Sequence, residues 1–220
     1  MKFRIGVMGS AQGPAMSKHS NEEKARALGR AIAEKRCILV NGSCPGLPDD
    51  AAEGAKKAGG FVLGISPAFS LKEHIKSYKS PIEHYDIILY TGMGLMERDI
   101  VNIRSSDAIV IIGGGIGTLN EFTVAFDEGK PLGILTETDG IADHIPEVVK
   151  LCHRKLNDRV IFDNNPRRLV ARILDILRKD SGPILEDERI ISNLTFEDDN
   201  TTSNVTITKS AKSTSHTDSL

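Results

Sequence analysis

"DAIVIIGGGIGTLNEF", residues 107–122, joins an unbroken apolar run to four glycines within five positions and then to a helix-like segment. Continuous hydrophobicity is typical of a strand that is covered on both faces, as in a parallel sheet. Small residues after such a strand let backbone amides approach a phosphate, and the start of the following helix adds a favourable dipole. The stretch therefore predicts a strand, an anion-binding loop and a helix in an α/β protein.

The rest of the chain repeats this alternation of strand and helix. Short apolar runs that are rich in β-branched residues and bounded by loop residues occur at 3–9, 37–42, 61–66, 86–92, 107–114, 131–135 and 159–163. The segments between them have helical periodicity; residues 165–180, for example, space their apolar side chains along one face. We predict a doubly wound (Rossmann-like) parallel sheet of about seven strands with helices on both faces.

The domain organisation follows from the composition along the chain. Residues 1–192 are predicted to form a single Rossmann-like nucleotide-binding domain, which is long enough to bury a sizeable core. Residues 193–220 are dominated by Ser, Thr, Asn and charged residues. Because they hold too few apolar residues to build a core, we predict a disordered Ser/Thr-rich tail.

Charge and cysteine content exclude several classes of protein. The net charge of −2 gives no basic field for nucleic acid. Three cysteines without CxxC spacing are typical of a reduced cytoplasmic protein. No apolar run is long enough for a signal peptide or a membrane span, so we expect no membrane association. The six histidines show no metal-ligand spacing, and we predict no metal site.

The glycine loop does not match the common nucleotide-binding fingerprints. It does not spell GxGxxG in register and the chain has no GK[ST], so neither a dinucleotide cofactor nor a P-loop enzyme is expected. Two other loops have a similar character: "GSAQG" at 9–13 and "NGSCPGLP" at 41–48. We expect the ends of the first, second, fourth and fifth strands to line one pocket. Ser10, in the first loop, either binds a ligand or caps a turn.

Glu121 and Arg98 are candidates for catalytic residues, and each also has a purely structural interpretation. Glu121 and Thr118 have the spacing of a capping box, in which Thr118 caps the helix and Glu121 bonds back to its backbone. Arg98 could be a solvated helix residue. It follows the fourth strand, however, and consecutive strands in such sheets are often neighbours, so we expect Arg98 and Glu121 to converge over one pocket.

The stretch "RDIVNIRSSDAIVIIGGGIGTLNEFTVAFDEGKPLGIL", residues 98–135, resembles the core of the LONELY GUY-type family, also labelled "possible lysine decarboxylase". Members carry an MxxRK motif, a strand and then PGGxGTxxE; the matching positions are Arg98, residues 113–118 and Glu121. Asp99 stands where the family has lysine. Gly113 replaces the proline, which is similar to a GGG branch that includes molybdenum-cofactor carrier proteins.

The resemblance implies hydrolysis of a nucleoside 5′-monophosphate into a free base and ribose 5-phosphate, a reaction for which no cofactor is required. Arg98 and Glu121 would be the catalytic residues. Glu121 in the first helical turn would stay ionised and either stabilise positive charge on the ribose or orient the attacking water. The residues expected to bind the nucleotide and its phosphate share the loops at the strand ends: Ser10, Gly113, Gly114, Gly115, Gly117 and Thr118.

An alternative is a protein that binds an AMP-like nucleotide or a pterin phosphate without turning it over, as a molybdenum-cofactor carrier or a nucleotide sensor would. Gly113 and the missing lysine at position 99 favour this binder, whereas Arg98 and Glu121 favour the enzyme. In either case the resemblance implies a homodimer.

Overall fold

The computed structural model describes residues 2–13 and 18–185, and the predicted tail at 193–220 and the predicted domain end at 192 lie outside them. The described residues as far as 183 belong to one compact unit. In the part of the chain that the structure describes, no helix is both long and apolar enough to cross a membrane.

All seven predicted strands are present, and they form one parallel sheet in the order β4-β3-β2-β1-β5-β6-β7. The strands are β1 (Arg4–Gly9), β2 (Ile38–Asn41), β3 (Phe61–Ser66), β4 (Ile87–Tyr90), β5 (Ala108–Ile112), β6 (Leu132–Leu135) and β7 (Val160–Asp163). The order reverses between β1 and β5, so the carboxyl ends of these two central strands form the switch point at which such sheets bind ligands. The predicted doubly wound α/β fold is confirmed.

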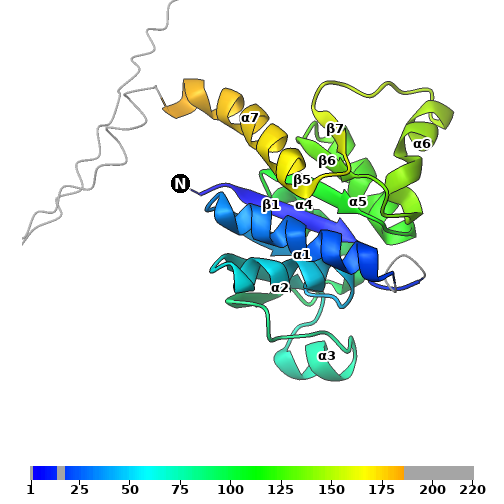
Figure 1. Ribbon diagram of the computed structural model, residues 1–220. Coiled ribbons are helices and arrows are strands. Elements are labelled where there is room, and N and C mark those ends of the chain that lie inside the picture. The colour runs from blue at the N-terminus through cyan, green and yellow to red at the C-terminus, as the bar shows by residue number, and fades with distance from the viewer. Residues whose placement is uncertain (1, 14–17, 186–220) are drawn as a thin grey trace, which may run out of the picture. The chain divides into compact units, whose positions relative to one another are not determined.

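Helices cover both faces of the sheet (Figure 1). They are α1 (His19–Glu34), α2 (Leu47–Lys57), α3 (Leu71–Lys76), α4 (Gly94–Arg104), α5 (Ile116–Asp127), the 3-10 helix η1 (Gly140–His144), α6 (Ile145–Leu151) and α7 (Pro166–Leu185). Helices α1, α2 and α7 contribute to one buried apolar cluster, and α4, α5, η1 and α6 to the other.

The central strands supply side chains to both clusters. In β5, Ala108, Val110 and Ile112 face the cluster with α1 and α2, while Ile109 and Ile111 face the cluster with α4 and α5. All five side chains are fully buried. The uninterrupted apolar run of β5 follows from this double coverage.

Candidate functional site

A pocket of about 400 Å³ lies at the carboxyl ends of β1 and β5. Its walls come from the end of β1, the loop after β2, helix α4 after β4, and the start of α5 after β5, which are the four segments expected from the sequence. The lining residues are Val7–Gln12, Gly42, Cys44, Pro48, Leu95, Met96, Arg98, Asp99, Gly115–Thr118 and Glu121.

The first two glycines of the loop do not face this pocket. The amide of Gly113 donates to Thr138 Oγ1 at 2.9 Å, and the amide of Gly114 donates to Ser10 Oγ at 2.6 Å. Neither glycine is among the lining residues. The expectation that Gly113 and Gly114 bind a phosphate is therefore corrected, because both amides are already satisfied within the protein.

The amides that remain for a ligand lie at the start of α5. The helix begins at Ile116 with Gly115 as its N-cap, and no side chain caps it. The first amides of a helix have no intrahelical acceptor. No acceptor within the described residues bonds to the amides of Gly115, Ile116 or Gly117. Nothing lies within 4 Å of a Cβ built on Gly115 or Gly117, so this end of α5 is open to an incoming anion.

Ser10 takes part in the same wall. Its side chain is buried and lines the pocket. Because Ser10 Oγ accepts the Gly114 amide, its hydroxyl hydrogen remains available as a donor. Ser10 thus supports the glycine loop, and it can also donate to a ligand.

The capping-box interpretation of Thr118 and Glu121 is wrong. Because Gly115 is the N-cap, Thr118 is the third residue of α5 and Glu121 the sixth, in the second turn. Within the described residues no hydrogen bond reaches the Glu121 carboxyl group, which lines the pocket at 8% exposure. Its position is therefore not explained by capping.

The prediction that the carboxyl group of Glu121 stays ionised is also corrected. Burial raises the pKa of Glu121 to about 8; the charge of Asp99 raises it further and the charge of Arg98 opposes the shift. In the second turn the helix dipole no longer compensates for the loss of water. With a pKa of about 8, Glu121 is mainly protonated at neutral pH.

Arg98 lies beside Glu121 in the pocket, but for a different reason than expected. Strands β4 and β5 are not neighbours: β4 is at the edge and three strands separate it from β5. Helix α4 crosses back over the sheet from β4 and packs against α5. The long crossover, and not strand adjacency, brings Arg98 to the pocket.

The Arg98 guanidinium is buried, with 4% of the residue exposed. Its Nη2 atom lies 3.6 Å from Asp99 Oδ1 and 3.7 Å from Cys44 Sγ, and its Nε has no partner within the described residues. A Cβ on Gly42 would lie 1.7 Å from Nη1. Gly42 belongs to the loop at 41–48 that was expected at the pocket, but it was not predicted as a site residue; its position directly after β2 was the available signal.

Asp99 makes the pocket more acidic than the family motif implies. Its carboxyl group is nearly buried and lines the pocket, where Oδ2 accepts a long 3.4 Å hydrogen bond from Asn120. Burial raises the pKa of Asp99, and Arg98 and Asn120 lower it. The pocket therefore holds two carboxyl groups and one buried arginine, and the charge of Arg98 lowers the pKa of both carboxyl groups.

Cys44 also lines the pocket, but it is not activated. Burial raises the pKa of its thiol, and the nearby Arg98 only partly offsets this shift. A nucleophilic cysteine needs a lowered pKa. No group of three or more His, Cys, Asp or Glu residues in the described ranges is arranged to hold a metal ion.

The fold and the pocket define a Rossmann-like α/β protein with a glycine loop at its switch point. The sequence profile of the SLOG cluster4 family matches residues 2–170, so the chain belongs to that family. This confirms the resemblance to LONELY GUY-type proteins.

Three known proteins show the range of relatives. An uncharacterised protein of Archaeoglobus fulgidus is 35% identical over 136 residues, 60% of this chain and 80% of that protein. A probable cytokinin riboside 5′-monophosphate phosphoribohydrolase of Oryza sativa subsp. japonica is 29% identical over 62% of this chain and 59% of its own length. The structure of the molybdenum cofactor carrier protein of Chlamydomonas reinhardtii superimposes with a TM-score of 0.64 at 29% identity, over 80% of this chain and 99% of that one.

Proposed function

We propose that this protein hydrolyses the N-glycosidic bond of a nucleoside 5′-monophosphate, releasing the base and ribose 5-phosphate. The observation that carries the proposal is that the buried Glu121 and Arg98 line the same pocket as the unpaired amides of Gly115 and Gly117, with Glu121 about one turn of α5 after Gly117. A rise of about 1.5 Å per residue puts Glu121 about 6 Å along the helix axis from Gly117. This separation is comparable with the length of a ribose 5-phosphate.

The phosphate is assigned to the start of α5. Amides of Gly115, Ile116 and Gly117, the Thr118 hydroxyl and the free Ser10 hydrogen supply neutral donors there. The helix dipole adds to the attraction for an anion. Basic side chains are then not required around the phosphate, and Arg98 is left for the reacting end of the ligand.

At the reacting end, the protonated Glu121 is suited to act as the acid. As the bond between C1′ and the base nitrogen breaks, its electron pair stays with the base, and Glu121 delivers its proton to a base nitrogen. The carboxylate that remains faces the positive charge on the ribose. Water then adds to C1′, its proton returns to Glu121, and Arg98 positions the base or stabilises it as it leaves.

A second candidate function is binding of a pterin phosphate or nucleotide without turnover. It is favoured by the full-length match to the molybdenum cofactor carrier protein, whereas the rice phosphoribohydrolase is matched over 59% of its length. Gly113 in the GGG loop and Asp99 in place of lysine also favour a binder. The unpaired amides of α5 would hold the phosphate in the same way.

The two functions are separated by a panel of nucleoside 5′-monophosphates incubated with the protein, with chromatography for free base and thermal-shift titration of the same ligands. Release of base and ribose 5-phosphate in equal amounts is the result expected for the hydrolase. Stabilisation by a nucleotide or a pterin phosphate without release of base would instead establish the binder.

Gly117→Ala is expected to weaken phosphate binding while leaving the fold intact. A Cβ at Gly117 meets nothing within 4 Å, and alanine favours a helix over glycine by about 1 kcal/mol, so stability should stay level or rise. The new methyl group lies where the phosphate approaches, and loss of hydrogen bonds to a charged group costs about 1.5–3 kcal/mol, or tenfold or more in affinity. Calorimetric titration with AMP measures this loss, and an unchanged affinity would remove the phosphate from this end of α5.

We also propose that the protein forms a homodimer through the apolar side chains along β4 and the start of α4. Residues with 46–51% exposure gather there: Ile87, Leu89, Met93, Leu95 and Met96. Exposed apolar groups in such number are typical of interfaces. Leu89→Glu should convert the dimer to a monomer in light scattering, and a wild-type protein that is monomeric at micromolar concentration would contradict the proposal.

A further inference from the structure

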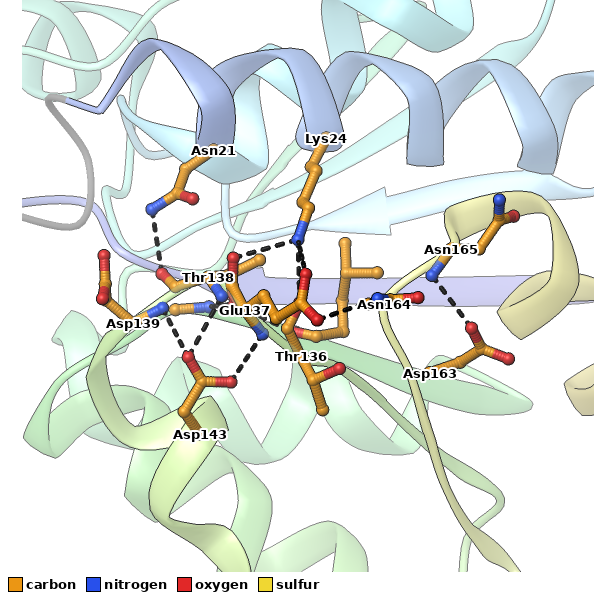
Figure 2. Close-up of polar contacts among 12 residues, drawn as sticks. Asn21, Lys24, Thr136, Glu137, Thr138, Asp139, Asp143, Asp163, Asn164 and Asn165 are labelled. Carbon is orange, nitrogen blue, oxygen red and sulfur yellow. Dashed lines mark hydrogen bonds and ion pairs between the residues drawn. The ribbon is translucent and has the colours of Figure 1, made fainter.

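The loop after β6 is built around one carboxylate, that of Asp143 (Figure 2). Its Oδ1 accepts the amide of Glu137 at 2.7 Å, and its Oδ2 accepts the amides of Thr138 and Asp139 at 3.1 and 2.8 Å. Glu137 and Asp139 have φ values of 58° and 60°, a conformation that non-glycine residues rarely adopt. Three charge-assisted hydrogen bonds to one side chain hold this unfavourable turn in place.

Helix α1 fixes the same turn from its other side. Lys24 Nζ donates to the carbonyl oxygens of Thr136 and Glu137 at 3.1 and 3.0 Å, and Asn21 Nδ2 donates to the carbonyl of Thr138 at 2.9 Å (Figure 2). Amides and carbonyls of the turn are therefore both bonded, which makes it a rigid support.

The turn reaches the glycine loop through the Thr138 side chain. Thr138 is fully buried; its hydroxyl donates to the carbonyl of Leu135 at 2.7 Å and accepts the amide of Gly113 at 2.9 Å. The hydroxyl thus links the end of β6 to the first residue after β5. A valine has the same shape but can make neither bond.

The residues that follow bond to the glycine carbonyls. Ile141 donates its amide to the carbonyl of Gly114 at 2.9 Å, and Ala142 donates to that of Gly113 at 3.0 Å. A Cβ on Gly140 would lie 2.3 Å from the Gly114 oxygen, so only glycine allows this approach. Both glycine carbonyls are therefore held by η1, and the amide of Gly113 is held by Thr138 in the turn before it.

We propose that Thr138 and Asp143 are positioning residues, which aim the unpaired amides of α5 into the pocket by fixing the backbone of Gly113 and Gly114. The glycines have φ values of 59° and 98°, and α5 starts two residues later. A glycine backbone without this support has many accessible conformations. Holding it in one conformation lowers the entropy lost when an anion binds. The inference rests on the proposed phosphate site at the start of α5.

The test compares Thr138→Val with Thr138→Ser, which keeps the hydroxyl group. Affinities for inorganic phosphate, AMP and adenosine are measured by calorimetry, and hydrogen exchange of residues 113–117 is followed by mass spectrometry. The valine variant should exchange the loop amides faster and bind phosphate and AMP about three- to tenfold more weakly, as expected for loss of one oriented hydrogen bond. Adenosine binding should not change, and serine should restore both properties. Asp143→Asn should behave like the valine variant.

Each other outcome is informative. Unchanged loop exchange and unchanged AMP affinity in Thr138→Val would overturn the inference. An equal loss of AMP and adenosine affinity would also overturn it, because the defect would then be general and not directed at the phosphate. If the wild type binds neither phosphate nor AMP, the proposed function is wrong. Hydrogen exchange still tests the inference in that case, because equal exchange of residues 113–117 in Thr138→Val and in the wild type would show that Thr138 does not support the loop.

Discussion

Glu121→Gln is expected to reduce hydrolysis of the preferred nucleotide by about a hundredfold or more, the loss typical of removing a group that stabilises developing charge. The amide keeps the shape of the side chain but can neither release a proton to the base nor carry the negative charge that faces the ribose. Nucleotide affinity should change little, because the phosphate is assigned to donors one turn away. Rates and affinities of the two proteins, measured side by side, check this expectation.

The same substitution should affect stability in a pH-dependent way. The pKa of Glu121 is raised to about 8 in the folded protein, so the folded state retains a proton that the unfolded chain has already released above its ordinary pKa of 4.5. The contribution of Glu121 to wild-type stability therefore falls as the pH rises from about 4.5 to about 8. Glu121→Gln has no such loss. Its melting temperature should exceed that of the wild type at pH 8–9 and match it near pH 4.

An inactive Glu121→Gln protein without this pH-dependent gain in stability would show that the carboxyl is ionised in the folded state, and its role as an acid would then be wrong. A fully active variant would contradict the hydrolase proposal itself.

Gly42→Ala is expected to lower activity by about a hundredfold, because displacing a positioned group by about 1 Å can cost this much. The new methyl group would lie 1.7 Å from Arg98 Nη1, so the guanidinium must move out of its buried position. Arg98→Ala is the matched control. If Gly42 acts only by making room for the guanidinium, the double variant should be no less active than Arg98→Ala alone. Additive losses would show that Gly42 has a separate role in the pocket.

The fold could be predicted because each strand is a short apolar run that can be identified from its own residues alone. Residues 108–112 form an apolar run that is followed directly by Gly113, and a continuous apolar run is what a central parallel strand, covered on both faces, requires. The pocket could be predicted as well, since loops at the carboxyl edge converge wherever the strands are parallel. Arg98 and Glu121 do lie in one pocket, but the reason given for it was wrong, because strand adjacency is a statistical tendency and β4 lies at the edge.

What could not be predicted depends on contacts between distant parts of the chain. The amide of Gly114 bonds to Ser10, 104 residues away, and the amide of Gly113 bonds to Thr138, 25 residues away. No local pattern shows that these amides are already used. The protonation of Glu121 likewise depends on its burial in the folded protein and on the charges of Asp99 and Arg98, whereas the sequence shows only its distance from the glycine loop.

The position of β1 in the middle of the sheet has a consequence for synthesis of the protein on the ribosome. Strands β1 to β4 emerge first and are consecutive neighbours in the order β4-β3-β2-β1, so this half can pair as it is made. The other edge of β1 pairs with β5, with Ile5 opposite Ala108, and stays uncovered until about one hundred further residues have been translated. Exposed strand edges of this kind are where nascent chains associate wrongly. Slow translation between β1 and β5 should therefore increase aggregation, and slow translation after β7, when all seven strands have been made, should not.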